Sequence, residues 1–366
     1  MPKPKKKAEK KSALKVGYVA LVGRPNVGKS MLLNSLLGQK ITIISNKPQT
    51  TRISILGIKT TEKGQIIFID NPGIHKPLHG LNRRMMNFVY SSLETADLIC
   101  LLIDATERFG HGDEFVLETL RKVTTPLFLL INKVDIVRKE NILLLIDKYK
   151  DLLPFKEIIP ISALKGTNLD VLEQEIFKYL PEAEKLFGDD EISDQSERFL
   201  LAEIIREKLL SHVEQELPFV TAVYIENIEK REPRAEMEGA REAGTEPDIQ
   251  TTQSAEAIGA IVPEAEGQSG PQGDSRAGSE AGGEAEKPKK KRRPVTYIGA
   301  SIFVEKDNHR KIIIGRHGQL VKAIGIEARR EIEEILESKV YLDLEVRVRE
   351  RWRDSPDVLD LIEGQK

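Results

Sequence analysis

Residues 16–180 alternate short apolar runs with segments whose apolar positions recur at helical spacing. The apolar runs are rich in leucine and β-branched residues and are bounded by polar segments, which is typical of buried strands. We therefore predict strands at 16–22, 53–58, 65–69, 98–103, 127–131 and 158–161, and helices at 30–37, 113–122, 141–151 and 168–180. This alternation predicts an α/β domain with a mostly parallel six-stranded sheet and helices on both faces.

A second, smaller α+β domain is predicted after a polar linker at 181–197. Within 198–366 we expect a helix at 198–216, strands at 219–225, 297–304 and 340–348, one helix after Gly318 and another at 326–338. The stretch 232–286 has no aromatic residue and many Gly, Ala, Glu and Pro residues. Such a segment buries too little apolar surface to offset the entropy of ordering. We predict a disordered insertion at 232–293 that ends in the basic sequence KPKKKRR.

Length and cysteine content narrow the class of protein. The chain has 366 residues, enough for two or three ordinary domains. Cys100 is its only cysteine, which excludes a disulfide framework and a multi-cysteine metal site, and which fits a reducing cytosol. We expect Cys100 to be buried because it stands in an apolar run. Residues 1–15 are rich in lysine and are predicted to be a basic disordered tail rather than a secretory signal. No apolar stretch approaches the roughly 18–20 residues of a membrane-spanning helix.

The net charge of −2 hides an uneven distribution. The stretch 232–286 carries 13 acidic and 3 basic residues, so the rest of the chain has 53 basic and 45 acidic residues. The folded parts are therefore mildly basic, which is compatible with a polyanionic partner.

A phosphate-binding motif lies between the first predicted strand and the first predicted helix. It fits G-x-x-x-x-G-K-[ST] and consists of Gly23, Arg24, Pro25, Asn26, Val27, Gly28, Lys29 and Ser30. Its glycines let the backbone wrap phosphates, and the helix N-terminus adds partial positive charge. Lys29 is expected to reach the β- and γ-phosphates, and Ser30 to coordinate Mg²⁺. This motif alone does not choose between ATP and GTP.

A second motif makes that choice. Asn132, Lys133, Val134 and Asp135 follow the strand at 127–131, at the carboxyl end where such sheets bind ligands. The Asp135 carboxylate can accept hydrogen bonds from guanine N1–H and N2–H₂, a pair of donors that adenine lacks. Asn132 is expected to brace the loops, and Lys133 to lie over the base.

Three further segments complete a nucleotide site. Asp70, Asn71, Pro72 and Gly73 end the strand at 65–69; Asp70 would hold Mg²⁺ through water and the Gly73 amide would contact the γ-phosphate. The segment KPQTTR offers a hydroxyl to Mg²⁺, for which we favour Thr51, with Thr50 as the alternative. Ser162, Ala163 and Leu164 would contact guanine O6 through backbone N–H. Lys29, Thr51 and Gly73 are the candidate catalytic residues.

The strings GRPNVGKS, KPQTTR, DNPGIH, NKVD and SALKG resemble the bacterial Era family, a group of translation-factor-related GTPases. The resemblance covers about 15–230 and 294–366. It implies a GTPase that binds GTP or GDP with Mg²⁺. It also implies slow hydrolysis, because Ile74 stands where Ras-like GTPases carry a water-orienting glutamine. Related GTPases use an asparagine at the Asn26 position to bind K⁺, so K⁺ is a further candidate ion; stabilising the turn is the other interpretation. We interpret His75 and His79 as surface histidines.

A candidate RNA-binding motif lies near the C-terminus. The G-x-x-G loop and its flanks comprise Ile313, Ile314, Gly315, Arg316, His317 and Gly318, with Lys322 on the following helix. In this setting the motif resembles a type II KH domain, whose loop grips about four nucleotides by their backbone. The insertion at 232–293 departs from typical Era chains, and both a neutral spacer and a partner-binding segment remain open for it.

The resemblance implies a partner and a cellular role. The expected partner is the small ribosomal subunit, near the 3′ end of its ribosomal RNA, during assembly and maturation of that subunit. We expect a cytoplasmic monomer, with the inner face of the cell membrane as a candidate peripheral site. One hypothesis is a switch in which GTP reorders segments 41–52 and 73–85 and changes RNA affinity. The competing hypothesis is a constitutive RNA-binding adaptor that holds nucleotide without using it.

Overall fold

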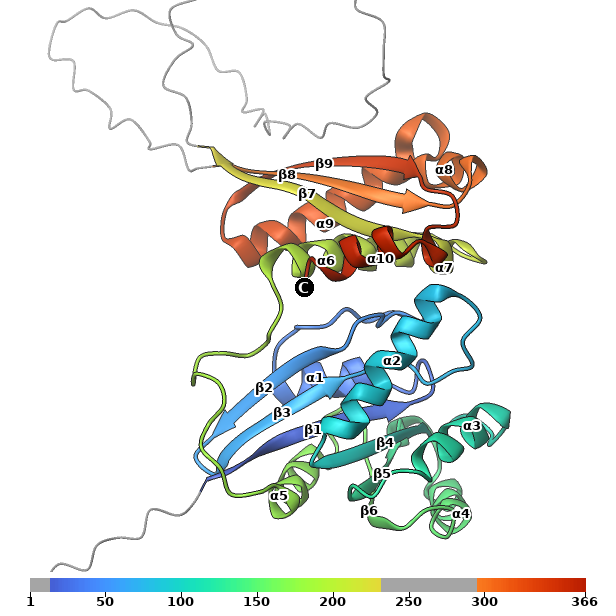
Figure 1. The fold of residues 1–366 in the computed structure, drawn as a ribbon, viewed down its shortest axis with the longest axis vertical. Helices are drawn as coiled ribbons and strands as arrows, with labels where there is room; N and C mark the ends of the chain where they lie inside the picture. Colours follow the sequence, from blue (N-terminus) through green and yellow to red (C-terminus); the bar gives the residue numbers. More distant parts are fainter. Residues whose placement is uncertain (1–13, 232–294) are drawn as a thin grey trace, which may run out of the picture.

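The computed structural model describes residues 14–231 and 295–366, which form two units, each built on its own sheet (Figure 1). The predicted insertion at 232–293 and all but the last two residues of the predicted basic tail lie outside the described residues. Within the described ranges, no helix is long and apolar enough to cross a bilayer.

The N-terminal unit contains the predicted six-stranded sheet. Its strand order is β2-β3-β1-β4-β5-β6, and β2 is its one antiparallel strand. The strands are β1 (Lys15–Gly23), β2 (Ile55–Thr61), β3 (Gly64–Asp70), β4 (Leu98–Asp104), β5 (Leu127–Asn132) and β6 (Phe155–Pro160). The helices are α1 (Lys29–Leu37), α2 (Gly80–Thr95), α3 (His111–Leu120), α4 (Lys139–Tyr149) and α5 (Leu169–Tyr179), with a single 3₁₀ turn, η1 (Val134–Ile136). The prediction of a mostly parallel sheet is confirmed.

Alternate residues of the central strands face two separate cores. On β4, Cys100 packs with α1 and α5 residues such as Leu33 and Leu172. Its neighbour Leu101 packs on the opposite face, among residues of α2, α3 and α4. Because a strand buried on both faces needs apolar residues at every position, this explains the uninterrupted apolar run. Cys100 is fully buried, as predicted, and burial raises the pKa of its thiol.

The C-terminal unit is a three-stranded sheet backed by two long helices. Its strand order is β7-β8-β9, with β7 antiparallel and β9 parallel to the central β8. The strands are β7 (Ala222–Arg231), β8 (Val295–Val304) and β9 (Lys339–Val348). The helices are α6 (Glu197–His212), α7 (Leu217–Val220), α8 (Asp307–Ile314), α9 (Gln319–Leu336) and α10 (Pro356–Glu363), with turns η2 (Arg316–Gly318) and η3 (Trp352–Asp354). Apolar residues of α6 and α9 pack on one face of this sheet.

Three sequence predictions for this unit were wrong in detail. The strand expected at 219–225 begins at 222, because Pro218 opens the short helix α7 instead. A helix, α8, directly precedes the G-x-x-G loop; Asp307 pairs with Arg310 and Lys311 one turn later, at 2.8 and 3.0 Å. The two helices expected after Gly318 are one helix of 18 residues.

The two units touch through the segments that flank the predicted nucleotide site. Leu81 and Met85 of α2 pack against Trp352 and Leu359 of the C-terminal unit. Arg84, also on α2, forms ion pairs with α10, at 2.6 Å to Asp360 and 2.9 Å to Glu363. The predicted linker lies along the edge strand β2, where Ile58 N donates to Ile192 O at 2.9 Å.

Candidate nucleotide and RNA sites

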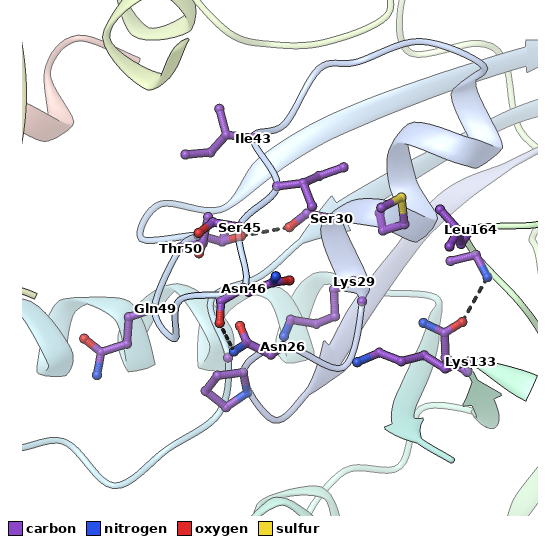
Figure 2. A pocket seen from close by; sticks show the side chains of 18 of the residues that line it. Asn26, Lys29, Ser30, Ile43, Ser45, Asn46, Gln49, Thr50, Lys133 and Leu164 are labelled. Carbon is purple, nitrogen blue, oxygen red and sulfur yellow. Dashed lines mark hydrogen bonds between the residues drawn. The ribbon is translucent and has the colours of Figure 1, made fainter. Parts of the chain in front are cut away.

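A pocket at the carboxyl ends of the parallel strands brings the predicted nucleotide motifs together (Figure 2). This is the edge at which open α/β sheets bind ligands. Figure 2 shows Lys29, from the start of α1, and Lys133, from the turn after β5, extending into the same space. The pocket is lined by residues from every predicted motif, among them Asn26, Ser30, Thr51, Gly73, Asp135, Ala163 and Leu164.

The phosphate-binding loop requires its two outer glycines. Gly23 and Gly28 have φ angles of +147° and +99°, which side chains rarely adopt. A Cβ at Gly28 would lie 2.3 Å from Nδ2 of Asn132. That amide group braces two loops: Nδ2 donates to Val27 O at 2.8 Å, and Oδ1 accepts from Ala163 N at 2.9 Å. The loop is therefore held in a curled form whose amides can surround a phosphate.

Lys29 is buried within this loop. Its Nζ donates to the carbonyl oxygens of Arg24 at 3.0 Å and Gly23 at 3.4 Å. Burial lowers the pKa of its ammonium to about 8, and the nearby Asp70 carboxylate offsets only part of this effect. A bound phosphate would restore the charged form, because an anion in this pocket stabilises a cation far better than two carbonyls do.

Three oxygen-bearing side chains converge beside Lys29. Ser30 Oγ donates to Asp70 Oδ2 at 2.7 Å and lies 2.9 Å from Thr51 Oγ1. The other carboxylate oxygen, Asp70 Oδ1, is buried and has no partner. Burial raises the pKa of Asp70 to about 6, although the Ser30 hydroxyl and the Lys29 ammonium act in the opposite direction. Hydroxyl and carboxylate oxygens are the ligands that Mg²⁺ prefers, so this group fits a magnesium ion.

The two threonines of KPQTTR have different surroundings. Thr51 Oγ1 lies 3.5 Å from Asp70 Oδ2, within the oxygen cluster. Thr50 Oγ1 donates to Lys47 O at 2.6 Å, within its own turn. The geometry therefore favours Thr51 over Thr50 as the hydroxyl that reaches a metal ion.

The base-binding end of the pocket combines polar and apolar groups. Asp135 Oδ1 accepts from Ser162 Oγ at 2.6 Å, which fixes the carboxylate. Leu164 is exposed at the pocket wall, with 65% of its surface accessible. Lys133 Nζ donates to Asp104 Oδ2 at 2.5 Å. Burial alone would raise the pKa of Asp104, but hydrogen bonds from Lys133 and Thr106 outweigh it and lower that pKa. Sequence reasoning missed Asp104, although it ends a buried strand at the ligand edge.

Several predicted nucleotide residues have side chains that point away from the pocket. Arg24 pairs with Asp113 of α3 at 3.0 Å, and Ile74 is buried in the core while its N–H donates to Gly23 O at 2.9 Å. Asn71 is also buried, where Nδ2 contacts Leu21 O at 3.3 Å. Such residues shape the site through packing and backbone.

The remaining residues of the predicted motifs also contribute through packing and backbone position. Pro25 contacts Gly73 closely, since a Cβ on that glycine would lie 2.6 Å from Pro25 N. Val27 is buried, Val134 lies in η1, and Pro72 is buried beside Asn71.

The G-x-x-G loop joins α8 to α9 in the C-terminal unit. Gly315 and Gly318 have φ angles of +74° and +73°, and Arg316 and His317 are exposed between them. No side chain caps the N-terminus of α9, which leaves amide donors for a phosphate.

The side chains around this loop have different exposures. Lys322 is exposed one turn into α9 and Ile314 is half-buried. The predicted RNA-binding residue Ile313 has its side chain fully buried in the core of the unit, so its predicted contact with RNA would be made through its backbone. The neighbouring Ile312 is the exposed member of the isoleucine triplet, at 51%.

The fold and these two sites define a P-loop GTPase unit joined to a KH domain. A family model described as 50S ribosome-binding GTPase matches residues 18–133, and a KH domain model matches residues 285–353. The GTPase Era of Halothermothrix orenii is 38% identical over 340 residues, which cover 93% of this chain and 95% of that protein. The chain therefore belongs to the Era GTPase family.

Two solved Era structures resemble the whole described chain. Era in complex with MgGDPNP and nucleotides 1506–1542 of 16S ribosomal RNA is 39% identical, with a TM-score of 0.76, and the match covers 95% of this chain and 98% of that chain. A variant of Aquifex aeolicus Era bound to GDP and AlF₄⁻ is 38% identical, with a TM-score of 0.74, and covers 95% and 99%. The expectation of an Era-type GTPase with a C-terminal KH domain is confirmed.

Proposed function

We propose that this GTPase uses the hydrolysis of GTP to control binding of ribosomal RNA from the small subunit, and that it acts in assembly and maturation of that subunit. The observation that carries the proposal is the oxygen cluster of Ser30, Thr51 and Asp70 beside Lys29, with Asp70 Oδ1 buried and unpartnered. An adaptor that merely held nucleotide would not need a metal-ready cluster closed by a switch hydroxyl.

Each candidate catalytic residue has one role in this proposal. Lys29 neutralises charge on the β- and γ-phosphates, and the Gly73 amide donates to a γ-phosphate oxygen. Thr51 closes on the metal only when a γ-phosphate is present. A magnesium ion held by Ser30, Thr51 and Asp70 supplies charge neutralisation between the β- and γ-phosphates. Since Ile74 cannot orient water, intrinsic hydrolysis is slow.

Guanine selectivity is assigned to Asp135, supported by its fixed carboxylate beside Ser162. In Asp135→Asn the amide presents a donor to guanine N1–H, so we expect loss of GTP binding and a gain for xanthine nucleotides. Calorimetry with GDP, XDP and ADP measures this. Unchanged preference for GDP would refute the base assignment, and equal binding of GDP and ADP by the wild type would refute the function itself.

The RNA partner is inferred from the Era complex that contains nucleotides 1506–1542 of 16S ribosomal RNA. The exposed Arg316 and His317, together with the uncapped N-terminus of α9, supply donors for a phosphate backbone. Replacing both side chains by aspartate is expected to abolish binding of the corresponding RNA fragment while GTP turnover stays unchanged. Retained RNA affinity in a filter-binding assay would contradict this assignment.

The switch hypothesis is favoured over the adaptor by contacts on both sides of Thr51. Arg206 of α6 donates to Thr50 O, and Arg52 donates to Pro218 O at 2.8 Å and to Thr221 O at 2.7 Å. When Thr51 moves toward a metal ion and a γ-phosphate, Thr50 and Arg52 move with it. Because both are hydrogen-bonded to the KH unit, the KH unit is expected to shift as well. Equal RNA affinity in the GDP and GDPNP states would favour the adaptor.

Domain boundaries, a potassium site, oligomeric state and localisation complete the proposal. We infer a division into a GTPase domain at 16–180, a linker at 181–197 and a KH domain at 198–366. K⁺ is proposed to bind near Asn26, whose Nδ2 lies 2.8 Å from the Asn46 carbonyl oxygen. A cytoplasmic monomer with peripheral attachment at the inner membrane face completes the proposal.

A further inference from the structure

His75 joins two segments, one that contains Gln49 and one that contains Gly73 and Asn82, and both Gln49 and Gly73 line the nucleotide pocket. Its Nδ1 lies 2.7 Å from the carbonyl oxygen of Gly73. Its Nε2 lies 3.2 Å from Nε2 of Gln49 and also contacts Nδ2 of Asn82, a buried residue of α2. The sequence-based interpretation of His75 as a surface histidine was wrong, because the side chain is partly buried between the two switch segments.

These contacts select one protonation state of the ring. A carbonyl oxygen can only accept, so Nδ1 carries the hydrogen that is donated to Gly73 O. The two side-chain amide nitrogens around Nε2 can only donate, so Nε2 must be the unprotonated acceptor. The geometry therefore describes the tautomer with hydrogen on Nδ1. It holds the first switch segment through Gln49 and the second through Gly73 and Asn82.

The partners of His75 lie at or near the two groups that are proposed to act in hydrolysis. Gln49 is two residues before Thr51, and the carbonyl that His75 holds belongs to Gly73. Thr51 and Gly73 are the two groups proposed to close on Mg²⁺ and the γ-phosphate. Figure 2 shows the Gln49 amide directed away from Lys29, so it does not reach the phosphate loop directly.

We propose that His75 is a positioning residue for GTP hydrolysis: it fastens the Gln49 segment to the Gly73 segment so that Thr51 and the Gly73 amide face the γ-phosphate together. The proposal rests on the function proposed above. Ile74 is buried and offers no polar group, so the residue after it supplies the polar link between the switches. His75 is not among the residues that line the nucleotide pocket, so it acts through its neighbours.

The size of the effect follows from the contacts that are lost. Removing the imidazole leaves the Gly73 carbonyl and two amides without their partner, and the loss of one such hydrogen bond in the transition state changes a rate roughly fivefold to tenfold. We expect His75→Ala to slow single-turnover GTP hydrolysis by about tenfold. GDP has no γ-phosphate for these segments to close on, so GDP affinity should stay within about twofold of the wild type.

Four companion variants make the test specific. His75→Phe fills the same space without polar atoms and should be as slow as His75→Ala, whereas His75→Gln restores an acceptor near Nε2 and should recover part of the rate. His79→Ala is the matched control, since His79 caps no N–H with its side chain at the start of α2. In a double-mutant cycle, Gln49→Ala should add little to His75→Ala, because both remove the same link.

The outcomes separate this inference from the function on which it rests. A wild-type rate in His75→Ala, in a protein that still binds GDP and hydrolyses GTP, would overturn the positioning role alone. A wild-type rate in His75→Phe with a slow His75→Ala would show that packing suffices. Ring ¹⁵N spectra of the GDPNP complex, assigned with His75→Gln, should show hydrogen on Nδ1 only; hydrogen on Nε2 would also contradict the proposal. If the wild-type protein did not hydrolyse GTP, the proposed function itself would be refuted.

Discussion

Replacing Arg52 by methionine tests whether the nucleotide segment communicates with the KH unit. The Arg52 guanidinium is buried, donates to the carbonyls of Pro218 and Thr221, and lies 5.7 Å from the centre of the Trp352 ring. No carboxylate pairs directly with it in the described structure. Methionine keeps the apolar stem against Trp352 and removes only the charged, donating end.

The magnitude follows from two opposing terms that nearly cancel. Burial, together with repulsion from Arg206, lowers the pKa of Arg52 to about 9, which corresponds to a cost on the order of 5 kcal/mol. Two hydrogen bonds from a charged donor contribute about 3–6 kcal/mol, and the ring contact about 1 kcal/mol more. The free energy of unfolding of Arg52→Met should therefore stay within about 2 kcal/mol of the wild type. The coupling between nucleotide and RNA, by contrast, should weaken, because Arg52 directly joins the KPQTTR segment to the KH unit.

The assay compares RNA affinity in the GDP and GDPNP states. Coupling between two sites is typically about 1–3 kcal/mol, or about 5- to 150-fold in affinity. We expect Arg52→Met to reduce the wild-type ratio at least about threefold. Arg198→Met is the matched control: Arg198 also donates to two carbonyls, at 3.3 and 3.2 Å, but both lie within the KH unit. An undiminished ratio in Arg52→Met would refute transmission through this arginine.

Three further predictions concern the metal and ion sites. Thr51→Ala should lower the hydrolysis rate by about 100-fold whereas Thr50→Ala changes it little, as single-turnover assays would show; the reverse order would contradict the geometric choice. The raised Asp70 pKa of about 6 means that protons compete with Mg²⁺ below that pH, so Mg²⁺ affinity in the GDP complex should fall toward pH 4 and stay level above pH 7. Hydrolysis should be faster in K⁺ than in Na⁺, and Asn26→Ala should remove the difference; equal rates in both salts would exclude the ion.

The nucleotide site could be predicted from the sequence because its parts are local. Each motif is a short string at the carboxyl end of a strand, and parallel strands bring those ends to one edge. Thus the 23–30 loop, Asp70 and Asp135 were expected to lie at one edge of the sheet before their distances were known, and the structure places them there. The helix α8 was missed for the opposite reason. Its turn is held by polar ion pairs from Asp307, whereas hydrophobic periodicity, the signal used for helices, is short there.

The contacts between segments that are distant in the chain could not be predicted from the sequence. The sequence KPQTTR does not predict that Arg52 is buried and donates to carbonyl oxygens 166 and 169 residues away. It also does not predict that Thr50 O accepts a hydrogen bond from α6. A buried guanidinium held by carbonyls alone has little net stabilising value, so its placement between the switch and the KH unit is better explained by communication than by stability. His75 follows the same logic, since its partners Gln49 and Asn82 lie on either side of it in the chain and meet only in the folded protein. In both cases the residue links two segments that nucleotide is expected to move, and its contribution should therefore appear in rates and affinity ratios rather than in unfolding.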